Sequence, residues 1–466
     1  MTNVSRRVFA AAVAIGAVEV GRGVPRAKAH TLLAQAAPTA PPAAPARVRA
    51  TLIKGARIFN GTAPALVEGM DVLIEGNMIR RIERGIDAPS GTTVIDAGGR
   101  TMMPGLIDAH WHSVLSSVSL ARILQSDFGY LNIVAARANR DALLRGFTSV
   151  RDVGGNVFAL QQATDEGIIE GPRIYPSGPT LSQTGGHGDF RGPNEVPTNP
   201  GAPLDYLQRI GMTLIADGVP EVIRRTREIL RMGASQVKVM AGGGVSSLYD
   251  PVDVTQYTFD EMKAAVEVAA TWNTYVTVHA FTDGSVQQAI NAGVRCIEHG
   301  MLLEEPTIRL MAEKGVWFSS QPILDDEDAI PFSDPVNRAK FIEVTNGTDR
   351  AYRLAKAHNL KIAFGTDTLF DPELAKKQGK QLAKLTRWFS PFETLKMATH
   401  DNAQLLAMSG PRNPYPGKLG VIEADAYADL LLVNGDPVRD INLIADPEHN
   451  LALIMKDGRV HKSTLA

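Results

Sequence analysis

Apolar positions recur along the chain with two different periods, and these divide it into three parts. Between residues 50 and 100, short apolar runs follow one another directly, and Glu75-Gly76-Asn77 separates two of them as a hairpin turn would. Between 101 and 410, short β-branched runs alternate with stretches of helical period. From 411 to 466 the strand pattern returns, with a second hairpin turn at Asp457-Gly458. The pattern predicts two terminal β segments around an α/β domain.

The α/β domain contains eight predicted strands. They are Thr101–His110, Thr148–Val153, Arg173–Ser177, Gln236–Met240, Tyr275–Ala280, Arg295–Glu298, Val316–Ser320 and Ile362–Thr366. Helical stretches such as Pro220–Met232 fill most of the intervals, so strand and helix alternate over about 310 residues. This pattern is typical of a (β/α)₈ TIM barrel, and we expect the terminal segments to pair into a small β-sandwich beside it. A doubly wound open sheet is the alternative, although no glycine-rich phosphate loop follows the first strand.

The composition is that of an ordinary globular enzyme, and it restricts the chemistry of any site. The chain has 466 residues, of which 48 are Lys or Arg and 50 are Asp or Glu, so the formal net charge is −2. This balance offers no basic excess to nucleic acid. Cys296 is the single cysteine, which excludes an intrachain disulfide and a cysteine-rich zinc module. Nitrogen and oxygen ligands would therefore hold any metal.

The N-terminal residues have the pattern of an export signal. Arg6-Arg7 precedes an apolar run from Ala10 to Val18, which is too short to cross a bilayer as a mature helix. Ala27-Lys28-Ala29 has the small-x-small form of a signal-peptidase site. We expect residues 1–29 to be a twin-arginine signal peptide that directs the protein to the periplasm. Residues 30–49 are rich in Ala and Pro and predict an extended linker. We expect no membrane span after them.

Polar residues with metal-binding chemistry stand where the predicted strands end. Asp108, His110 and His112 occupy alternate positions at the end of the first strand, so the two imidazoles share one direction. The alternative for the two histidines taken alone is a strand end whose imidazoles face solvent. Later strands add the following residues at corresponding places: Lys238, His279, His299 and Asp367. Because active-site residues of such barrels gather at the C-terminal ends of strands, we expect these side chains to converge.

Lys238 lies between Val237 and Val239 in the fourth predicted strand, so its ammonium group is expected to be buried. A buried ammonium group either loses its proton or finds a partner. A neutral amine reacts with CO₂ to form a carbamate, and the two oxygens of a carbamate are able to bridge two cations. The alternative is a lysine that pairs with a carboxylate of the barrel.

Together these motifs resemble the amidohydrolase superfamily, in the branch that has two metals and a carboxylated lysine. The matching segments are Pro104–His112, Lys238, His279, Ile297–Gly300, Gly365–Asp367 and a tail from Gly420 to Pro437. The segment from Lys238 to His279 is most similar to the imidazolonepropionase-like prolidases and Xaa-carboxypeptidases. That group also contains ochratoxin-type amidases.

The resemblance implies a role for each residue of the cluster. The metal ligands that it implies are His110, His112, Lys238, His279, His299 and Asp367. The first two and the aspartate would hold the more buried cation, the other histidines the more exposed one, and N6-carboxylysine at Lys238 would bridge both. Two divalent ions, expected to be Zn²⁺, would share a hydroxide that attacks the substrate carbonyl. Asp367 would accept the proton of this hydroxide and pass it to the leaving nitrogen. Asp108, deeper in the barrel, is expected to orient a ligand imidazole.

Further candidates surround this cluster. His187, on a glycine-rich loop after the third strand, is a candidate catalytic and substrate-binding residue that would contact the carbonyl or the oxyanion. Tyr249 and Tyr257 follow the fourth strand and are candidates for contact with a substrate carboxylate, with packing as the alternative. Arg151 and Asp152 are expected to form a structural ion pair.

The resemblance implies hydrolysis of an amide or peptide bond, with a dipeptide or an N-acyl amino acid that has a free carboxylate as the expected substrate. Phe281 stands two residues past His279, where some prolidase-like relatives have tyrosine, and this departure weakens the prolidase assignment. The alternatives are a cyclic amidase, a carbamate or urea hydrolase, and a barrel that binds ligands without catalysis. We expect a small-molecule partner and no nucleic acid, and a homo-oligomer stays open.

Overall fold

The computed structural model describes most of the chain after the predicted linker. The described residues are 50–192, 194–195, 203–247 and 249–465. The predicted signal peptide and the Ala/Pro-rich linker, residues 1–29 and 30–49, therefore lie outside the described residues. Within the described ranges, no helix is both long enough and apolar enough to cross a membrane.

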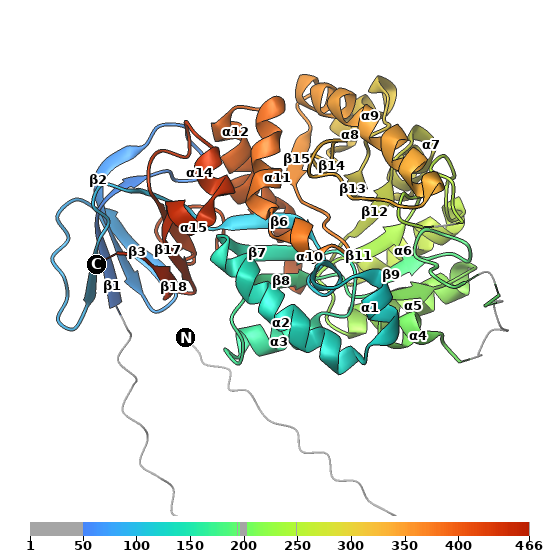
Figure 1. The fold of residues 1–466 in the computed structure, drawn as a ribbon, viewed down its shortest axis with the longest axis horizontal. Coiled ribbons are helices and arrows are strands. Elements are labelled where there is room, and N and C mark those ends of the chain that lie inside the picture. Colours follow the sequence, from blue (N-terminus) through green and yellow to red (C-terminus); the bar gives the residue numbers. More distant parts are fainter. Residues whose placement is uncertain (1–49, 193, 196–202, 248, 466) are drawn as a thin grey trace, which may run out of the picture. The chain divides into compact units, whose positions relative to one another are not determined.

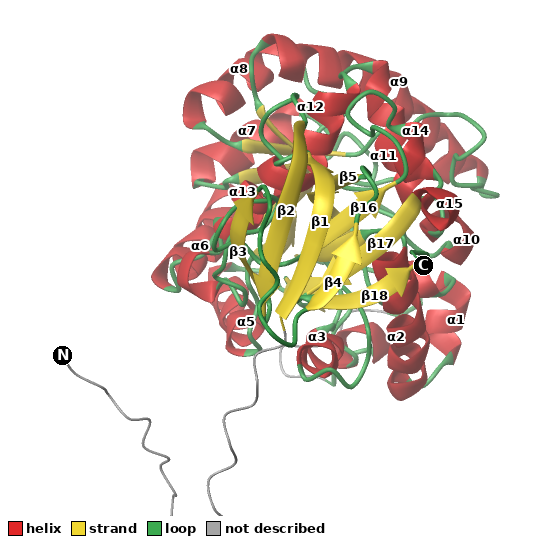
Figure 2. Ribbon diagram, turned by 90° about the vertical axis from the view of Figure 1, so that its left-hand side faces the viewer, coloured by secondary structure: helices red, strands yellow, loops and turns green. Residues whose placement is uncertain are grey.

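The two ends of the described chain meet in one mixed sheet of eight strands. Its strands are β1 (Ala50–Ile58), β2 (Val67–Glu75), β3 (Met78–Glu83), β4 (Thr93–Asp96), β5 (Thr101–Pro104), β16 (Leu430–Val433), β17 (Leu451–Lys456) and β18 (Arg459–Ser463). Their order is β18-β17-β16-β5-β1-β2-β3, with β4 paired to β1, and Figure 2 shows them side by side. The antiparallel pairing of β5 with β16 joins the two ends, with Met103 opposite Leu431. The predicted pairing of the terminal segments is confirmed, in the form of a mixed sheet.

The side chains of β16 alternate between two hydrophobic clusters. Leu430 and Leu432 pack with Met102 and other residues of the mixed sheet. Leu431 and Val433 belong instead to the large cluster that the parallel strands form with their helices. Because successive side chains of a strand point to opposite faces, this alternation attaches the mixed sheet to the α/β part of the molecule.

The α/β part contains two parallel sheets. Their strands are β6 (Leu106–Trp111), β7 (Phe147–Asp152) and β8 (Arg173–Pro176) in one, and β9 (Thr180–Ser182), β10 (Thr213–Ile215), β11 (Val237–Met240), β12 (Val276–Ala280), β13 (Cys296–His299), β14 (Trp317–Ser320) and β15 (Lys361–Phe364) in the other. The orders are β6-β7-β8 and β10-β9-β11-β12-β13-β14-β15. Seven of the eight predicted strands coincide with observed ones to within two residues at either end. The short strands β9 and β10 were not expected.

The first predicted strand, Thr101–His110, is wrong as a single element. Gly105 divides it into β5, which belongs to the mixed sheet, and β6, which belongs to a parallel sheet. The Gly105 backbone N–H donates to the carbonyl of Asp429 at 2.9 Å. A Cβ atom at this position would lie 2.1 Å from the Thr148 hydroxyl, so only glycine fits here. The chain therefore changes sheets at Gly105, directly before the metal-binding motif.

Backbone hydrogen bonds connect the two parallel sheets on both sides. The Asp367 N–H donates to the carbonyl of His110 at 2.8 Å, which joins the end of β15 to β6. The Ser235 N–H donates to the carbonyl of Pro176 at 2.7 Å, which joins β8 to the segment before β11. Because all the strand pairs in these sheets are parallel, their carboxyl ends lie at one edge.

Helices cover the outer side of the parallel strands (Figure 1). They are α1 (Leu120–Gln125), α2 (Phe128–Leu144), α3 (Phe158–Asp165), α4 (Tyr206–Arg209), α5 (Val219–Arg231), α6 (Phe259–Thr271), α7 (Asp283–Ala292), α8 (Glu305–Lys314), α9 (Pro335–Ala357), α10 (Pro372–Ala375), α11 (Gln378–Lys384), α12 (Pro391–Lys396), α13 (Asn402–Ala407), α14 (Asn442–Ala445) and α15 (Pro447–Asn450). Gly293 and Gly315 end α7 and α8 in the left-handed conformation, with φ values of 106° and 65°.

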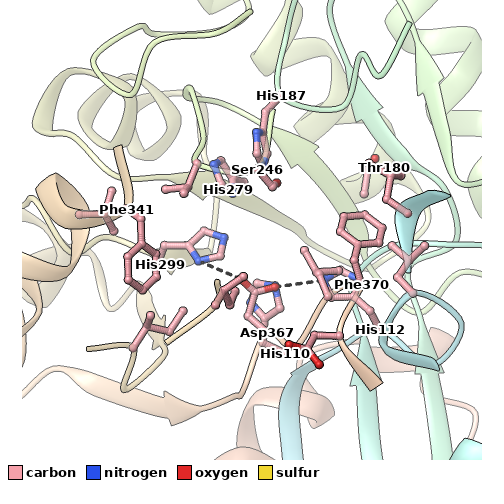
Figure 3. Close-up of a pocket in the computed structure, with 18 of the residues that line it drawn as sticks. His110, His112, Thr180, His187, Ser246, His279, His299, Phe341, Asp367 and Phe370 are labelled. Atoms are coloured by element: carbon pink, nitrogen blue, oxygen red, sulfur yellow. Dashed lines mark ion pairs between the residues drawn. The ribbon is translucent and has the colours of Figure 1, made fainter. Parts of the chain in front are cut away.

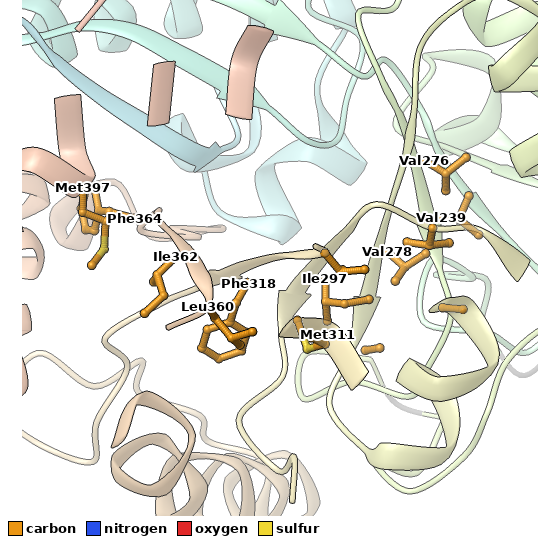
Figure 4. Close-up of a cluster of buried hydrophobic side chains, with 14 of the residues drawn as sticks. Val239, Val276, Val278, Ile297, Met311, Phe318, Leu360, Ile362, Phe364 and Met397 are labelled. Atoms are coloured by element: carbon orange, nitrogen blue, oxygen red, sulfur yellow. The ribbon is translucent and has the colours of Figure 1, made fainter. Parts of the chain in front are cut away.

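The strands and helices enclose a continuous apolar core. Val278, Ile297 and Phe318, from three successive strands, are fully buried in it. Figure 4 shows these side chains beside Met311 of α8. Strands that are buried on both faces read as continuous apolar runs, which is why they were recognisable in the sequence. The polar residues among them stand at the carboxyl ends of the strands.

Candidate metal centre

The six residues expected to bind metal all line one cavity of about 290 Å³ at the carboxyl ends of the parallel strands. They are His110 at the end of β6, His112 directly after it, Lys238 in β11, His279 in β12, His299 at the end of β13 and Asp367 after β15. Each has little solvent exposure, with Lys238 exposed by 2% and the four histidines by 5% or less. The structure thus brings together side chains that are up to 257 positions apart, from His110 to Asp367.

His110 and His112 direct the same ring nitrogen at one carboxylate oxygen. Their Nε2 atoms lie 3.1 Å and 3.3 Å from Oδ1 of Asp367. Nδ1 of His299 lies 3.7 Å from the other oxygen of Asp367 (Figure 3). One ligand atom each from His110, His299 and Asp367 lie within 4.8 Å of one another, which is compatible with a single metal ion. The expectation that the two strand-end imidazoles share a direction is therefore fulfilled in this geometry.

Two residues of the cluster have strained backbones. Asp367 has φ 51° and His299 has φ 75°, in the left-handed region that non-glycine residues rarely adopt. Gly365 makes room for this arrangement, because a Cβ atom there would lie 2.3 Å from Cβ of His110. Backbone strain of this kind persists only where the surrounding structure imposes it, and it gathers at functional sites.

A buried charged network fixes the His110 ring. Nδ1 of His110 lies 2.8 Å from Oε2 of Glu298, and the other oxygen of Glu298 accepts a hydrogen bond from Arg151 at 2.6 Å. Burial alone would raise the pKa of Glu298, but Arg151 and His110 outweigh it and hold this pKa well below its ordinary value. An ionised Glu298 fixes the tautomer of His110, so that Nε2 is free to bind a metal.

The expected ion pair between Arg151 and Asp152 is wrong. Arg151 pairs with Glu298, and its guanidinium also donates to Tyr275 and Ser319. Successive residues of a strand point to opposite faces, so Asp152 lies on the other side of β7. Asp152 instead accepts hydrogen bonds from the backbone N–H groups of two loop residues, Ser113 and Gly154.

In the described chain no hydrogen bond joins Asp108 to the imidazole of a candidate ligand, so its role differs from the expected one. Its carboxylate accepts hydrogen bonds from the His110 backbone N–H and from the hydroxyl of Thr366. The amide of Gln378 donates to it at 2.8 Å. Asp108 therefore fixes the backbone before His110 to the backbone before Asp367, whereas it was expected to hold an imidazole.

Lys238 has a buried amino group without a protein partner. Among the residues that the structure describes, no carboxylate lies within 4 Å of its Nζ and no hydrogen bond to it is present. Burial lowers the pKa of Lys238, and the opposing attraction of Glu298 and Asp367 does not restore it. Burial also lowers the pKa of His299, to about 3, and it holds the pKa of His279 well below its ordinary value. Neutral amines and imidazoles have free lone pairs, which suits a metal-binding cluster.

The chain matches a known protein family over most of its length. The family model of the amidohydrolase family matches residues 101–461. This chain belongs to the amidohydrolase family.

Among its relatives, this amidohydrolase is 33% identical to ochratoxinase from Aspergillus niger over 383 residues, which cover 78% of this chain and 75% of the relative. The crystal structure of a prolidase complexed with N-methylphosphonate-L-proline is 34% identical, with a TM-score of 0.82 over 89% of this chain and 100% of the other. A Xaa-Pro dipeptidase with methionine bound in its active site is 28% identical, with a TM-score of 0.76 over 88% and 99% of the two chains.

His187 of the amidohydrolase lines the same cavity, on the loop after β9. Its ring stacks on that of His279, with the centroids 4.0 Å apart and the planes 20° from parallel. Nδ1 of His187 lies 2.8 Å from the Ser247 hydroxyl and 3.4 Å from a carboxylate oxygen of Asp250. Gly244 provides the space, because a Cβ atom there would lie 2.0 Å from this ring. His187 is thus held rigidly above a predicted metal ligand.

The two candidate tyrosines are not among the residues that line the cavity. Tyr249 is 48% exposed, and Tyr257 is buried in the large apolar core with a positive φ of 60°. Tyr257 therefore packs in the core, which was the alternative to a substrate contact, and Tyr249 faces solvent. The expected contacts with a substrate carboxylate have no counterpart in this arrangement.

Two polar residues near the site, Glu298 and Lys340, were not expected from the sequence. Glu298 is a charged residue inside the fully buried strand β13, which was a usable signal of a buried polar network. Lys340 of α9 is buried, and its ammonium donates to the carbonyls of Gly244, Ser247 and Asp250 at 3.2, 3.0 and 2.8 Å. The position of Lys340 on the apolar face of a 23-residue helix was a signal in the sequence that this lysine is buried and has a polar partner.

Proposed function

We propose that this amidohydrolase is a binuclear metal-dependent hydrolase of amide bonds, built on a (β/α)₈ barrel with a small β-sandwich from both chain ends. The observation that carries the proposal is the lining of one cavity by all six expected ligands. The backbone hydrogen bonds at both junctions of the parallel sheets support a closed barrel. The shared apolar cluster of the terminal strands supports the sandwich.

The donor set of the cavity fits two divalent cations. His110, His112 and Asp367 would hold one cation, because both Nε2 atoms face the same carboxylate oxygen. His279 and His299 would hold the other, since burial keeps both imidazoles neutral. Imidazole and carboxylate donors suit Zn²⁺ and, to a lesser degree, other first-row ions. When bound, the cations would lower the pKa of a water molecule and polarise the scissile carbonyl.

Lys238 would complete the centre as a carbamate. Its neutral amine attacks the carbon of CO₂, an N–C bond forms, and one proton leaves the nitrogen to solvent. The product carries one negative charge on two oxygens, which suits a position between two cations. The absence of a carboxylate partner for Lys238 in the described cavity and the lowered pKa of its amine support this step.

Two residues of the chain would handle the proton and the oxyanion. Burial opposes ionisation of Asp367, but His110, His112 and His299 hold its pKa well below the ordinary value, so it is a carboxylate at neutral pH. It would accept the proton of the attacking water and deliver it to the leaving nitrogen. His187 has Nδ1 engaged by Ser247 and Asp250, which leaves Nε2 to donate to the substrate oxygen as negative charge develops there.

The proposed substrates are dipeptides and N-acyl amino acids. Ochratoxinase, a prolidase and a Xaa-Pro dipeptidase are among the similar proteins, and the two structures hold small ligands related to amino acids. The test is a hydrolysis screen of the zinc-loaded protein against dipeptides, N-acyl amino acids, cyclic amides, carbamates and ureas. Release of the amine from the first two classes is expected. Turnover of cyclic amides, carbamates or ureas alone would replace this substrate assignment.

Export by the twin-arginine route belongs to the same proposal. The pair Arg6-Arg7 and the apolar run after it support this assignment. The full chain is expected in the periplasm of a bacterial host, and an Arg6→Lys, Arg7→Lys variant is expected in the cytoplasm. An equal distribution of both forms would remove the export assignment.

A further inference from the structure

The cavity that holds the candidate metal ligands has two apolar walls, which come from two separate hydrophobic clusters. One wall is formed by Ile123, Leu207 and Met212 with Phe190 and Phe370. These residues come from α1, α4, the segments after β9 and before β10, and the loop after β15. Phe190 and Phe370 meet edge to face, with their centroids 6.5 Å apart. This arrangement suits a flat or branched apolar group.

The second wall lies on the other side of the histidines. It is formed by Phe281, Met301, Ile323 and Val344, with Phe341 of α9 packed against Phe332 at 5.6 Å between centroids. Figure 3 shows Phe341 beside His299 and Phe370 beside His112, with the metal-binding side chains between them. A reacting bond at the cluster would therefore have apolar surface on either side of it.

Two basic side chains next to residues of the cavity lining are held in ion pairs. Lys384 lies 2.7 Å from Asp326 and 3.6 Å from Asp328. Arg191 is in a bidentate pair with Asp189, at 2.7 and 2.6 Å. An arginine or lysine whose charge is already balanced has little left to attract a substrate carboxylate.

The cavity lining itself offers no further cation. Among the described residues, Lys238 is the one lysine of the lining, which contains no arginine, and it belongs to the candidate metal cluster. Lys340 is behind the wall, with its three protons directed at backbone carbonyls. Asp371 adds a carboxylate to the lining and caps α10 without an ion-pair partner in the described chain. A negative group on the substrate would meet apolar surface and a like charge.

We propose that this cavity selects amides with a bulky apolar group on both sides of the scissile bond, and that a carboxylate on the substrate is not required. The inference rests on the proposed amide hydrolysis and narrows its substrate class. An N-aroyl or N-arylacyl derivative of phenylalanine, and equally its neutral carboxamide, are the expected substrates. In this cavity, apolar contacts on two sides would provide the substrate recognition that other sites obtain from an ion pair with a substrate carboxylate.

The test is a matched substrate series with the zinc-loaded wild-type enzyme. The series contains N-phenylacetyl-phenylalanine, its carboxamide, N-acetyl-phenylalanine and N-phenylacetyl-glycine. We expect kcat/KM of the first two to agree within about threefold, and each truncated substrate to fall by about tenfold or more, chiefly through KM. A preference of a hundredfold for the carboxylate, or equal turnover of the truncated substrates, would overturn the inference while leaving amide hydrolysis in place. Failure to hydrolyse any amide would instead overturn the proposed function.

Variants of the two walls give an independent readout. Phe370→Ala and Phe341→Ala each shorten one wall. We expect each variant to lose the preference over one truncated substrate, either N-acetyl-phenylalanine or N-phenylacetyl-glycine, and to keep the preference over the other. Ile133→Ala, on the exposed face of α2 with 73% exposure, is the control and should change neither ratio. If both wall variants keep the wild-type kcat/KM ratios between the full substrate and the two truncated substrates, the walls do not select the substrate and the inference is contradicted.

Discussion

Nδ1 of His110 lies 2.8 Å from Oε2 of Glu298, and both side chains are fully buried. Because Arg151 holds the other oxygen of Glu298, this ionised carboxylate favours the tautomer of His110 that carries its proton on Nδ1. Glu298 is thus a positioning residue for His110, which would be a ligand of the proposed metal centre.

Replacing Glu298 with glutamine tests this arrangement. Glu298→Gln leaves Arg151 without its buried carboxylate, so we expect the free energy of unfolding to fall by about 3–5 kcal/mol. The affinity for the metal bound by His110 should fall by about 10- to 100-fold. Chemical denaturation and metal titration measure the two effects. Glu305→Gln, at an exposed ion pair with His358, is the control and should change both quantities little. Unchanged metal affinity in Glu298→Gln would contradict the account.

Lys340 is expected to stabilise the loop that positions His187. Lys340→Met leaves the carbonyls of Gly244, Ser247 and Asp250 without their donor, and it should lower the free energy of unfolding by about 2–4 kcal/mol. Because Ser247 and Asp250 contact His187, kcat should fall more than KM rises. Arg338→Met on the same helix breaks an exposed pair with Asp325 and provides the matched control. Equal stability of the two variants would remove this role of Lys340.

His187 is expected to act in catalysis without holding metal. His187→Ala should retain the metal content of the wild type and lower kcat by about 100- to 1,000-fold, as loss of an oxyanion donor does. His449→Ala, at a side chain with 76% exposure, is the control. Measurement of kcat together with metal content distinguishes this role from ligation, because loss of metal in His187→Ala would show that the ring supports the centre itself.

Asp152 should make stability depend on pH. Burial raises the pKa of Asp152 to about 6, above its ordinary value of 3.8. The folded state therefore binds the proton of Asp152 more tightly than the unfolded state does. Protonation of Asp152 stabilises the folded state below pH 4, and this stabilisation is lost as the pH rises through 6. The free energy of unfolding of the wild type, relative to that of Asp152→Asn, should therefore fall by up to about 3 kcal/mol as the pH rises through this window. Denaturation at pH 4 and pH 7 measures it, and a difference that stays constant would refute the shift.

The strands and the convergence of the candidate ligands were predictable because their signals are local. Strands buried on both faces are continuous apolar runs, and a histidine or lysine that interrupts or ends such a run is conspicuous. Seven strands and the convergence of His110, His279 and His299 follow from this. The break at Gly105 was not visible, because it depends on the close approach of Thr148 and on a hydrogen bond to Asp429.

Contacts between distant segments account for what the sequence did not reveal. The partner of Arg151 is Glu298, 147 positions away, so the neighbouring Asp152 was the natural but incorrect choice. Lys340 reaches a loop that is 90 to 96 positions earlier. The two apolar walls combine side chains from six or more loops and helices, and loop conformation follows from packing that no local pattern encodes.

The most direct test of the central claim is a metal count by plasma mass spectrometry on the purified wild type and on Lys238→Ala, alongside amide hydrolysis. Two divalent ions per wild-type chain are predicted. Lys238→Ala, which cannot form the carbamate, is predicted to retain one ion or fewer and to lose at least about a thousandfold in kcat, with addition of a small carboxylate restoring part of both. A folded, metal-free wild type that hydrolyses amides, or a Lys238→Ala variant that keeps two ions and full activity, would contradict the account.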